Sequence, residues 1–190
     1  FVLLTGVTKF SQISVFSGFN QPQDISFDGR YDGLCGITKD ELLTVFKEQI
    51  KELGEANGMT EKETIAKLTQ KYDGYHFSKR MNDIFNPFSI LNCLAKRDFQ
   101  DYWFSTGTPT YLMRLMANNN ENINELAGKE YPAAEFVDYK ATRQRPLPML
   151  YQSGYLTIKG YNKRRDIYCL DFPNEEVKSG MVTALSSDYF

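Results

Sequence analysis

The sequence predicts an α+β fold that is mainly helical and ends in a winged-helix-like unit. Two capping boxes precede apolar residues at helical spacing, and two further helix starts are marked by Asn-Pro and Thr-Pro pairs. Near the C-terminus, two β-type runs flank a basic turn. These observations predict helices through residues 38–128 and a β-hairpin after residue 154.

Length and composition limit the class of protein. The 190 residues fit one domain or two small ones, and 42% apolar residues with 14 Phe, 12 Tyr and 1 Trp exclude wholesale disorder. No apolar stretch approaches the roughly 18 residues that span a bilayer, and no signal peptide is recognisable. The three cysteines are widely spaced and form no CxxC pair. We expect a soluble cytoplasmic protein with no membrane partner.

Residues 1–5 form a continuous apolar run, which predicts a strand buried on both faces of a parallel sheet. One such strand cannot be a domain alone, and the chain begins at Phe1 rather than Met, so we expect a piece of a longer protein. The segment 18–36 is rich in Gly, Asn, Asp and Pro, which predicts a loop with at most a short strand.

The first two helices are predicted by their capping boxes. Thr38 with Glu41 opens one helix, and Thr60 with Glu63 opens the next, which ends at Asp73-Gly74. Apolar residues follow each cap at helical spacing, so we expect a helical hairpin. Two more helices open at Asn86-Pro87 and Thr108-Pro109, with the polar residue as N-cap and proline at the first helical position.

Beyond Lys129 the pattern changes. Phe136–Tyr139 has the composition of a strand, Pro146–Ser153 that of a helix, and Tyr155–Ile158 with Ile167–Leu170 that of a hairpin with a long basic tip. Asn174 then caps a last helix. Helix, hairpin and helix in this order suggest the winged-helix-like unit.

The motifs of common catalytic sites are missing from these residues. The sequence contains no P-loop, GxGxxG, HExxH or GxSxG motif, and His76 is its single histidine. Asp138-Tyr139-Lys140 matches the D-x-K pattern of metal-dependent nucleases, but the second carboxylate that such a site needs is not predicted on a neighbouring strand. We therefore expect no catalytic residue and no metal site in this chain.

A basic stretch runs between residues 140 and 165. It holds seven of the 22 basic residues and none of the 24 acidic ones. One interpretation is a surface that contacts the phosphate backbone of a nucleic acid. The other, which we favour, is a solvated turn whose charges pair with an acidic neighbouring domain. The basic residues are Lys140, Arg143, Arg145, Lys159, Lys163, Arg164 and Arg165.

An aromatic turn, Tyr-Asp-Gly-Tyr-His-Phe at residues 72–77, follows the second predicted helix. Its rings and its glycine break suit stacking on a purine, with His76 near the base edge or a phosphate. The alternative is a turn anchored in the core by Tyr75 and Phe77, which composition alone favours.

Five motifs in order carry a family resemblance over nearly the whole chain. They are FVLLTGVTKFSQISVFSGFNQPQDIS, YDGYHF, FNPFSIL, DYWFSTGTPTYL, and YQSGYLTI with LDFPNEEV. They resemble the predicted AAA-ATPase-like family common in gut Bacteroidetes and related bacteria. The resemblance implies an upstream P-loop core with an acidic metal-binding segment, and in many members a downstream restriction-endonuclease-like nuclease domain. These would be the partners of this chain within one protein.

The resemblance also implies roles for individual residues. Thr8, and next to it Thr5, would be polar sensors of the γ-phosphate, and Lys9 would add charge there or remain a surface lysine. The turn containing Asp73, Tyr75 and His76 resembles the lid segment that covers adenine. ATP and Mg are expected in the full-length parent, whereas this chain alone should neither hydrolyse ATP nor bind it tightly, because it lacks the P-loop.

The expected organisation has three parts: a remnant core strand with its loop (1–36), a helical lid (37–128) and the winged-helix-like unit (129–190). The expected function is nucleotide sensing and conformational switching within an AAA-type ATPase. Two alternatives remain: a nucleic-acid-binding module that uses the basic 140–165 face, and a purely structural module that packs against neighbouring domains or a second copy.

Overall fold

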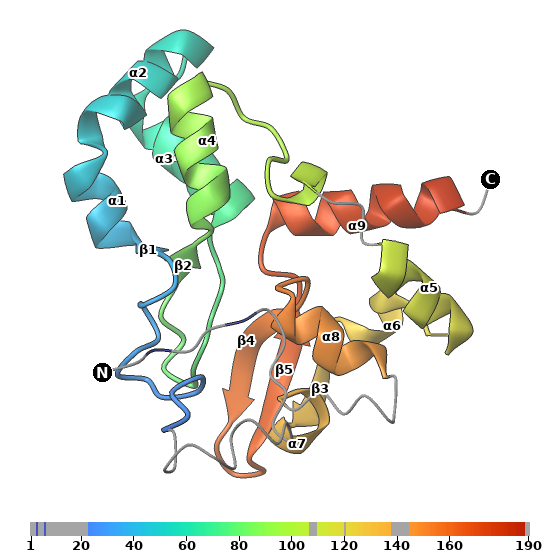
Figure 1. The fold of residues 1–190 in the computed structure, drawn as a ribbon. Helices are drawn as coiled ribbons and strands as arrows, with labels where there is room; N and C mark the ends of the chain where they lie inside the picture. The colour runs from blue at the N-terminus through green and yellow to red at the C-terminus, as the bar shows by residue number, and fades with distance from the viewer. Residues whose placement is uncertain are drawn as a thin grey trace.

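The computed structural model describes residues 3, 6, 23–106, 110–119, 121–137 and 145–188 (Figure 1). Within these ranges the protein is α+β and mainly helical, with a two-stranded and a three-stranded antiparallel sheet. This confirms the predicted fold class. No helix in these ranges is both long and apolar enough to cross a membrane.

The helices in the N-terminal half are α1 (Lys39–Val45), α2 (Lys47–Asn57), α3 (Glu61–Tyr72) and α4 (Pro87–Lys96), followed by a 3-10 turn at Phe104–Thr106. The remaining helices are α5 (Thr110–Asn118), α6 (Ile123–Leu126), α7 (Ala133–Phe136), α8 (Pro146–Gln152) and α9 (Glu175–Asp188). The strands are β1 (Ile37–Thr38), β2 (Ile84–Phe85), β3 (Lys129–Pro132), β4 (Thr157–Asn162) and β5 (Ile167–Asp171).

The predicted helix starts at Thr38, Thr60 and Asn86 are confirmed. Both capping boxes are formed, and the Asn86 side chain accepts hydrogen bonds from the backbone at the start of α4. The prediction of one continuous helix after Thr38 is wrong, because the chain breaks at Phe46 between α1 and α2. Just before the break, the Thr44 hydroxyl donates to the Asp40 carbonyl at 2.7 Å, a type of contact that often bends a helix.

Helices α1–α4 form the helical subdomain around their own apolar core. This helical core is completed by side chains of β2 and of the loop after α4, and the hydroxyl of Tyr72 within it donates to the Gln100 carbonyl at 2.8 Å. Its buried members are Leu42, Ile50, Leu53, Leu68, Tyr72, Phe85, Ile90, Cys93, Leu94 and Tyr102.

The three-stranded sheet, with strand order β3-β5-β4, organises the C-terminal unit. The predicted hairpin is confirmed as the antiparallel pair β4–β5, and the predicted helix at Pro146 is confirmed as α8. Helices α5 and α6, which the sequence analysis assigned to the lid, contribute their buried side chains to the core of this unit. The members of this sheet core on α5–α9 and the strands include Leu112, Met116, Phe136, Leu150, Ile158, Leu170, Val177 and Met181.

The prediction of a strand beginning at Phe136 is wrong for the residues of that segment that the structure describes. Phe136 ends helix α7, and the strand of this region is β3, four residues earlier. The Phe136 ring is fully buried against the rings of Phe27, Tyr151 and Tyr168, with centroids 4.7–6.0 Å apart. Tertiary packing of this aromatic cluster therefore overrides the local β-type composition. The Asp138–Lys140 motif lies outside the described residues.

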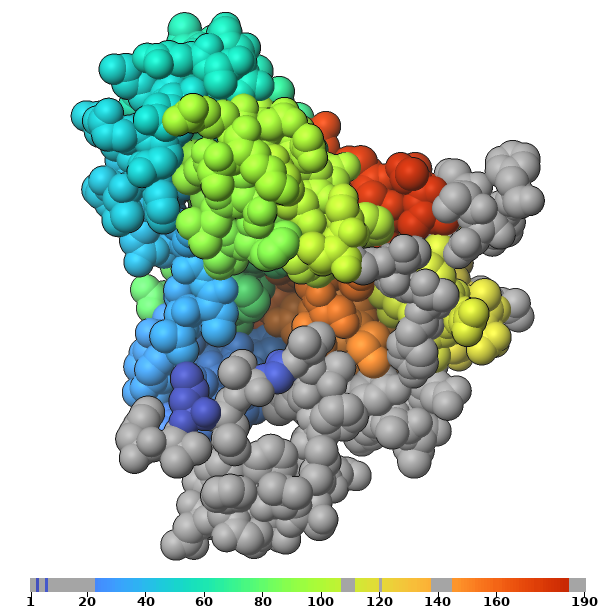
Figure 2. All heavy atoms as spheres, turned by 45° about the horizontal axis from the view of Figure 1, so that its top comes forward, coloured from blue at the N-terminus to red at the C-terminus, as the bar shows by residue number. Residues whose placement is uncertain are grey.

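Helix α9 lies between the helical subdomain and α8 (Figure 1). With the top of the molecule turned forward, α9 is visible beside the atoms of α4 and of the loop that follows it (Figure 2). Its Val177 and Met181 belong to the sheet core, while the helix also contacts α3 and the Phe104 turn. The start of α9 is therefore a place where the two subdomains touch.

Candidate functional site: a polar joint between two cores

Buried polar side chains gather where the helical core and the sheet core meet. Of the eight buried polar or charged side chains among the described residues, five lie on this boundary, together with the partly buried Lys159. We call this set the polar joint. Its members are Asp73, His76, Ser89, Thr157, Lys159 and Glu176.

An arm of the helical subdomain, Tyr75–Ile84, reaches across the boundary. Tyr72 and Phe85 at its two ends belong to the helical core, whereas Tyr75 and Ile84 belong to the sheet core. Reciprocal backbone hydrogen bonds of 3.1 Å between Tyr75 and Ile84 close the arm at its base. The chain thus crosses from one core to the other at residues 73–75 and returns at 84–85.

Gly74 allows the first crossing. Its φ of 94° lies in the left-handed region that favours glycine, and a β-carbon there would lie 2.5 Å from both Lys159 Nζ and the Pro173 carbonyl oxygen. The space is filled because Lys159 Nζ donates to the Gly74 carbonyl at 2.6 Å and to that of Pro173 at 2.8 Å. Burial lowers the pKa of Lys159, and the carboxylates of Asp83, Asp73 and Asp171 oppose that shift.

His76 joins the arm to strand β4 through backbone and ring. Thr157 Oγ1 accepts from the His76 N–H at 2.9 Å and donates to the His76 carbonyl at 3.0 Å. The ring places Nδ1 2.6 Å from the Ile158 carbonyl oxygen and Nε2 2.7 Å from Asp83 Oδ1. A carbonyl only accepts, so Nδ1 carries a proton. Both ring nitrogens are therefore engaged inside the protein.

Asp73 connects the end of α3 to the start of α9. Asn174 Nδ2 donates to the Asp73 carbonyl at 3.1 Å, while Asn174 Oδ1 accepts from the Val177 N–H at 3.2 Å and caps α9. Burial raises the pKa of the Asp73 carboxyl; the Gly74 N–H, which donates to it at 2.8 Å, opposes the rise. One asparagine thus fixes both the helix start and the turn.

Glu176 forms the second contact of α9 with the helical subdomain. Its fully buried carboxylate accepts from Ser89 Oγ of α4 at 2.7 Å through Oε2 and from the Trp103 N–H at 2.7 Å through Oε1. The Trp103 ring lies 5.1 Å from the Tyr155 ring of the C-terminal unit, centroid to centroid. One side chain of α9 thereby holds α4 and the loop after it.

The structure brings together the predicted site residues of the aromatic turn. Asp73, Tyr75 and His76 are 5%, 8% and 6% exposed, and Asp73 and His76 bond to protein groups. In this arrangement the turn is packed against the C-terminal unit and hydrogen-bonded to it. The sensor candidates Thr5, Thr8 and Lys9 lie outside the described residues.

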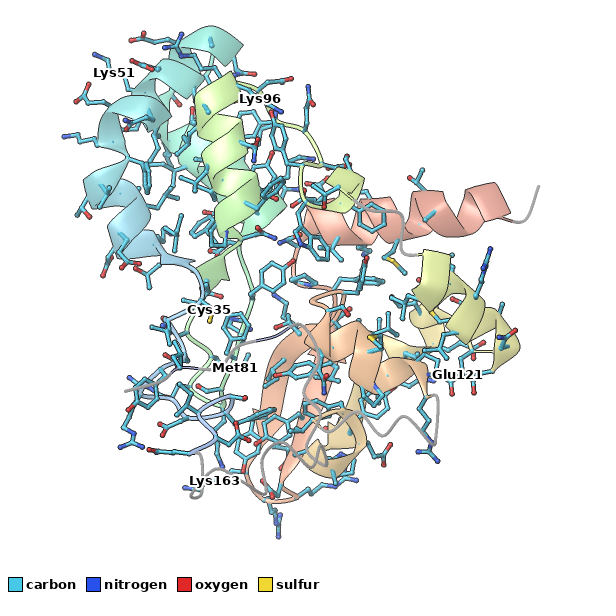
Figure 3. All side chains as sticks on the ribbon, in the orientation of Figure 1. Cys35, Lys51, Met81, Lys96, Glu121 and Lys163 are labelled. Carbon is cyan, nitrogen blue, oxygen red and sulfur yellow. The ribbon has the colours of Figure 1, made fainter. Side chains whose placement is uncertain are left out.

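The predicted basic face divides into separate places. Lys159 belongs to the polar joint, whereas Lys163, Arg164 and Arg165 are exposed at the hairpin tip, where Arg165 pairs with Glu130 at 3.0 Å. Figure 3 shows Lys163 at the opposite end of the molecule from Lys51 and Lys96 of the helical subdomain. Arg145 is exposed before α8, and Lys140 and Arg143 lie outside the described residues.

Sequence reasoning missed the parts of the joint contributed by the C-terminal unit. Thr157, Lys159 and Glu176 occur in segments read only as a strand, a basic stretch and a helix start. The one signal available was the Asn174 cap, which places Glu176 in the first turn of α9. Within the described ranges, no group of three or more His, Cys, Asp or Glu side chains is placed to hold a metal ion.

Comparison with known proteins identifies a relative of this chain. The chain is 34% identical over its full length to an uncharacterized protein in the vnfD 5′ region of Azotobacter chroococcum mcd 1. It spans about a third (35%) of the length of that protein. No family model and no solved structure matches the chain.

Proposed function

We propose that this chain is the sensor, lid and winged-helix-like portion of an ATPase-like protein, and that it contributes nucleotide sensing and conformational switching without catalysing a reaction alone. The observation that carries the proposal is the polar joint between two separate apolar cores. The sequence motifs that resemble AAA-ATPase-like proteins supply the nucleotide part of the proposal. The greater length of the Azotobacter relative is compatible with a larger parent.

The chemistry of the joint favours movement. An interface closed by an extended apolar surface resists opening, because separation exposes that surface to water. Here Lys159 and Glu176 are ionisable groups held by neutral hydrogen-bond partners, and both regain hydration when the joint opens. The loss of hydrogen bonds on opening is thus offset by solvation. Such a joint suits two bodies that reorient.

The arrangement of the C-terminal unit supports the winged-helix-like part of the proposal. Its chain order is α5, α6, β3, α7, α8, β4, β5 and α9, with β5 between β3 and β4 in the sheet. Two short helices, α7 and α8, precede the β4–β5 hairpin, and the earlier strand β3 pairs with β5. This is the order of elements in a winged-helix unit. Helix α8 turns Leu147 and Leu150 into the sheet core, so its role here is packing.

Because the side chains of the aromatic turn are buried in contacts with the protein, we place nucleotide contact upstream, at the segment that includes Thr5, Thr8 and Lys9. The full-length parent would hold ATP and Mg there with its P-loop core. The joint would then respond to nucleotide through movement of the two subdomains. His76 and Asp73 act in this scheme by holding the closed arrangement.

Calorimetric titration with Mg-ATP tests this proposal. We compare this 190-residue chain with a longer chain of the same protein that includes any upstream P-loop, at one fixed low salt concentration. We expect binding only by the longer chain, and weaker nucleotide-dependent turnover when its His76 is replaced by Ala. Absence of binding by both chains would overturn the nucleotide role.

A second candidate function is nucleic-acid binding, favoured by the exposed tip residues Lys163, Arg164 and Arg165. Contacts to phosphates make affinity fall steeply with salt. We would measure binding of duplex DNA at two salt concentrations, with the three tip residues replaced by Gln as the comparison. Salt-dependent binding that the triple variant loses would favour this candidate over the nucleotide switch.

A further inference from the structure

Glu176 is an unusual group at the boundary of the two subdomains. It is fully buried, and among the described residues it forms no ion pair with a lysine or arginine. Its two oxygens contact two separate segments of the helical subdomain, Ser89 on α4 and the backbone of Trp103. Whatever changes the state of this carboxyl group therefore acts on both contacts at once.

We propose that Glu176 is a proton-dependent latch, whose protonated form fastens α4 and the Trp103 segment to α9 and whose ionised form releases them. This inference rests on the proposed switching role, since a latch matters only where the two subdomains separate. It adds a regulator, the proton, to the joint that the proposed function requires.

The contacts of Glu176 persist when it takes up a proton. A protonated Oε2 donates to Ser89 Oγ, because a serine hydroxyl accepts as well as it donates, and Oε1 still accepts from the Trp103 N–H. The neutral group keeps these hydrogen bonds without a buried charge. The ionised group keeps them only with its charge shielded from water, which is unfavourable.

The groups around Glu176 act in opposite directions. Burial raises its pKa; Ser89 and the N–H groups of Trp103 and Phe104 oppose the rise, and the negative charge of Asp101 adds to it. Asp101 itself pairs with Lys71 of α3. Tyr72 of α3 and Tyr75 of the arm also face Glu176, and burial raises the pKa of both phenols, so they stay neutral while Glu176 titrates.

The sign of the pH dependence follows from this shift. Closed protein binds the Glu176 proton more tightly than open protein, so the closed form is fully favoured below the ordinary glutamate pKa. As the pH rises from there through the raised pKa, the closed form loses stability. The latch therefore opens with increasing pH.

Trp103 provides a reporter for the latch, because it is the single tryptophan of the sequence and its backbone N–H donates to Glu176. We would record its fluorescence from about pH 4, just below the ordinary glutamate pKa, to about pH 8. We expect a red shift of the emission as pH rises, while far-UV circular dichroism stays constant. Glu175→Gln, on the exposed neighbour in the same helical turn, should behave like the unmodified chain.

Glu176→Gln should abolish the red shift and keep the closed spectrum throughout. If this variant fails to fold, Ser89→Ala tests the latch instead. It removes a hydrogen-bond donor that favours the ionised form of Glu176, so the midpoint of the fluorescence transition should move to higher pH by on the order of one unit. An unchanged transition in the Gln variant, or an unmoved midpoint in the Ala variant, overturns the latch. So does a red shift that coincides with loss of helical signal. No nucleotide is present, so this result and the Mg-ATP titration fail independently.

Discussion

The helical subdomain and the polar joint are held together by contacts of different range. In the helical subdomain, the capping boxes join residues three positions apart, and an apolar core does the rest. In the joint, the hydrogen bonds by which His76, Asp73 and Glu176 reach the other subdomain link residues 73 to 101 positions apart. The first region is defined by local sequence, whereas the second exists only once both subdomains have folded and met.

This difference implies that the two regions respond differently to substitution. A change in the helical subdomain should lower the stability of that subdomain without altering how it sits on the C-terminal unit. A change in the joint should weaken the closed arrangement while each core stays intact. Urea unfolding and the Trp103 emission separate these effects, because the first reports total stability and the second reports the boundary.

The largest effect is expected for Gly74→Ala. The new β-carbon meets Lys159 Nζ and the Pro173 carbonyl oxygen at 2.5 Å, and the residue must hold a φ of 94°. Strain and displacement together should lower the free energy of unfolding by about 2–5 kcal/mol and expose Trp103.

Gly58→Ala is the matched control for Gly74→Ala. Gly58 also has a positive φ, 63°, but nothing lies within 4 Å of a β-carbon there. Only the backbone penalty of about 1–2 kcal/mol should remain, without a change in Trp103 emission. Equal losses in the two variants would mean that the joint is not tightly packed around Gly74.

Thr157→Val is expected to have the next largest effect. Valine keeps the shape of threonine but removes the hydroxyl that bonds both the N–H and the carbonyl of His76. Two buried backbone groups lose their partner, so urea unfolding should show a loss of about 1–3 kcal/mol. Thr157→Ser keeps the hydroxyl and should retain most of the stability. If serine were as harmful as valine, the methyl group rather than the hydrogen bonds would matter.

The contrast in range also explains how much the sequence could predict. The starts of α1, α3 and α4, the hairpin and the helix-ending turn at Asp73 all follow from residues a few positions apart, and the structure confirms them. The break at Phe46 and the helical state of Phe136 depend on backbone competition and aromatic packing that no local pattern contains.

The candidate site was predictable only in its N-terminal half. The YDGYHF turn has a distinctive composition, so Asp73, Tyr75 and His76 could be chosen from sequence alone. Their partners could not be chosen in this way. In the sequence, Lys159 resembles the other members of a basic stretch, and Glu176 resembles any acidic residue at a helix start. Burial gives these two residues their roles, and burial at a subdomain boundary depends on the whole fold.

The smallest effect is expected for Thr60→Ala, which tests the local side of the comparison. The Thr60 hydroxyl accepts from the Glu63 N–H at 3.3 Å, and Glu63 Oε2 accepts from the Thr60 N–H at 2.8 Å, so the cap is made entirely within one turn of α3. Its loss should lower the free energy of unfolding by about 1 kcal/mol, as for other threonine caps. Helix α3 ends in the joint at Asp73, so a change of Trp103 emission in this variant would show that the start of α3 is coupled to the boundary. An unchanged emission would show that the loss of stability stays within the helical subdomain, as two separate cores require.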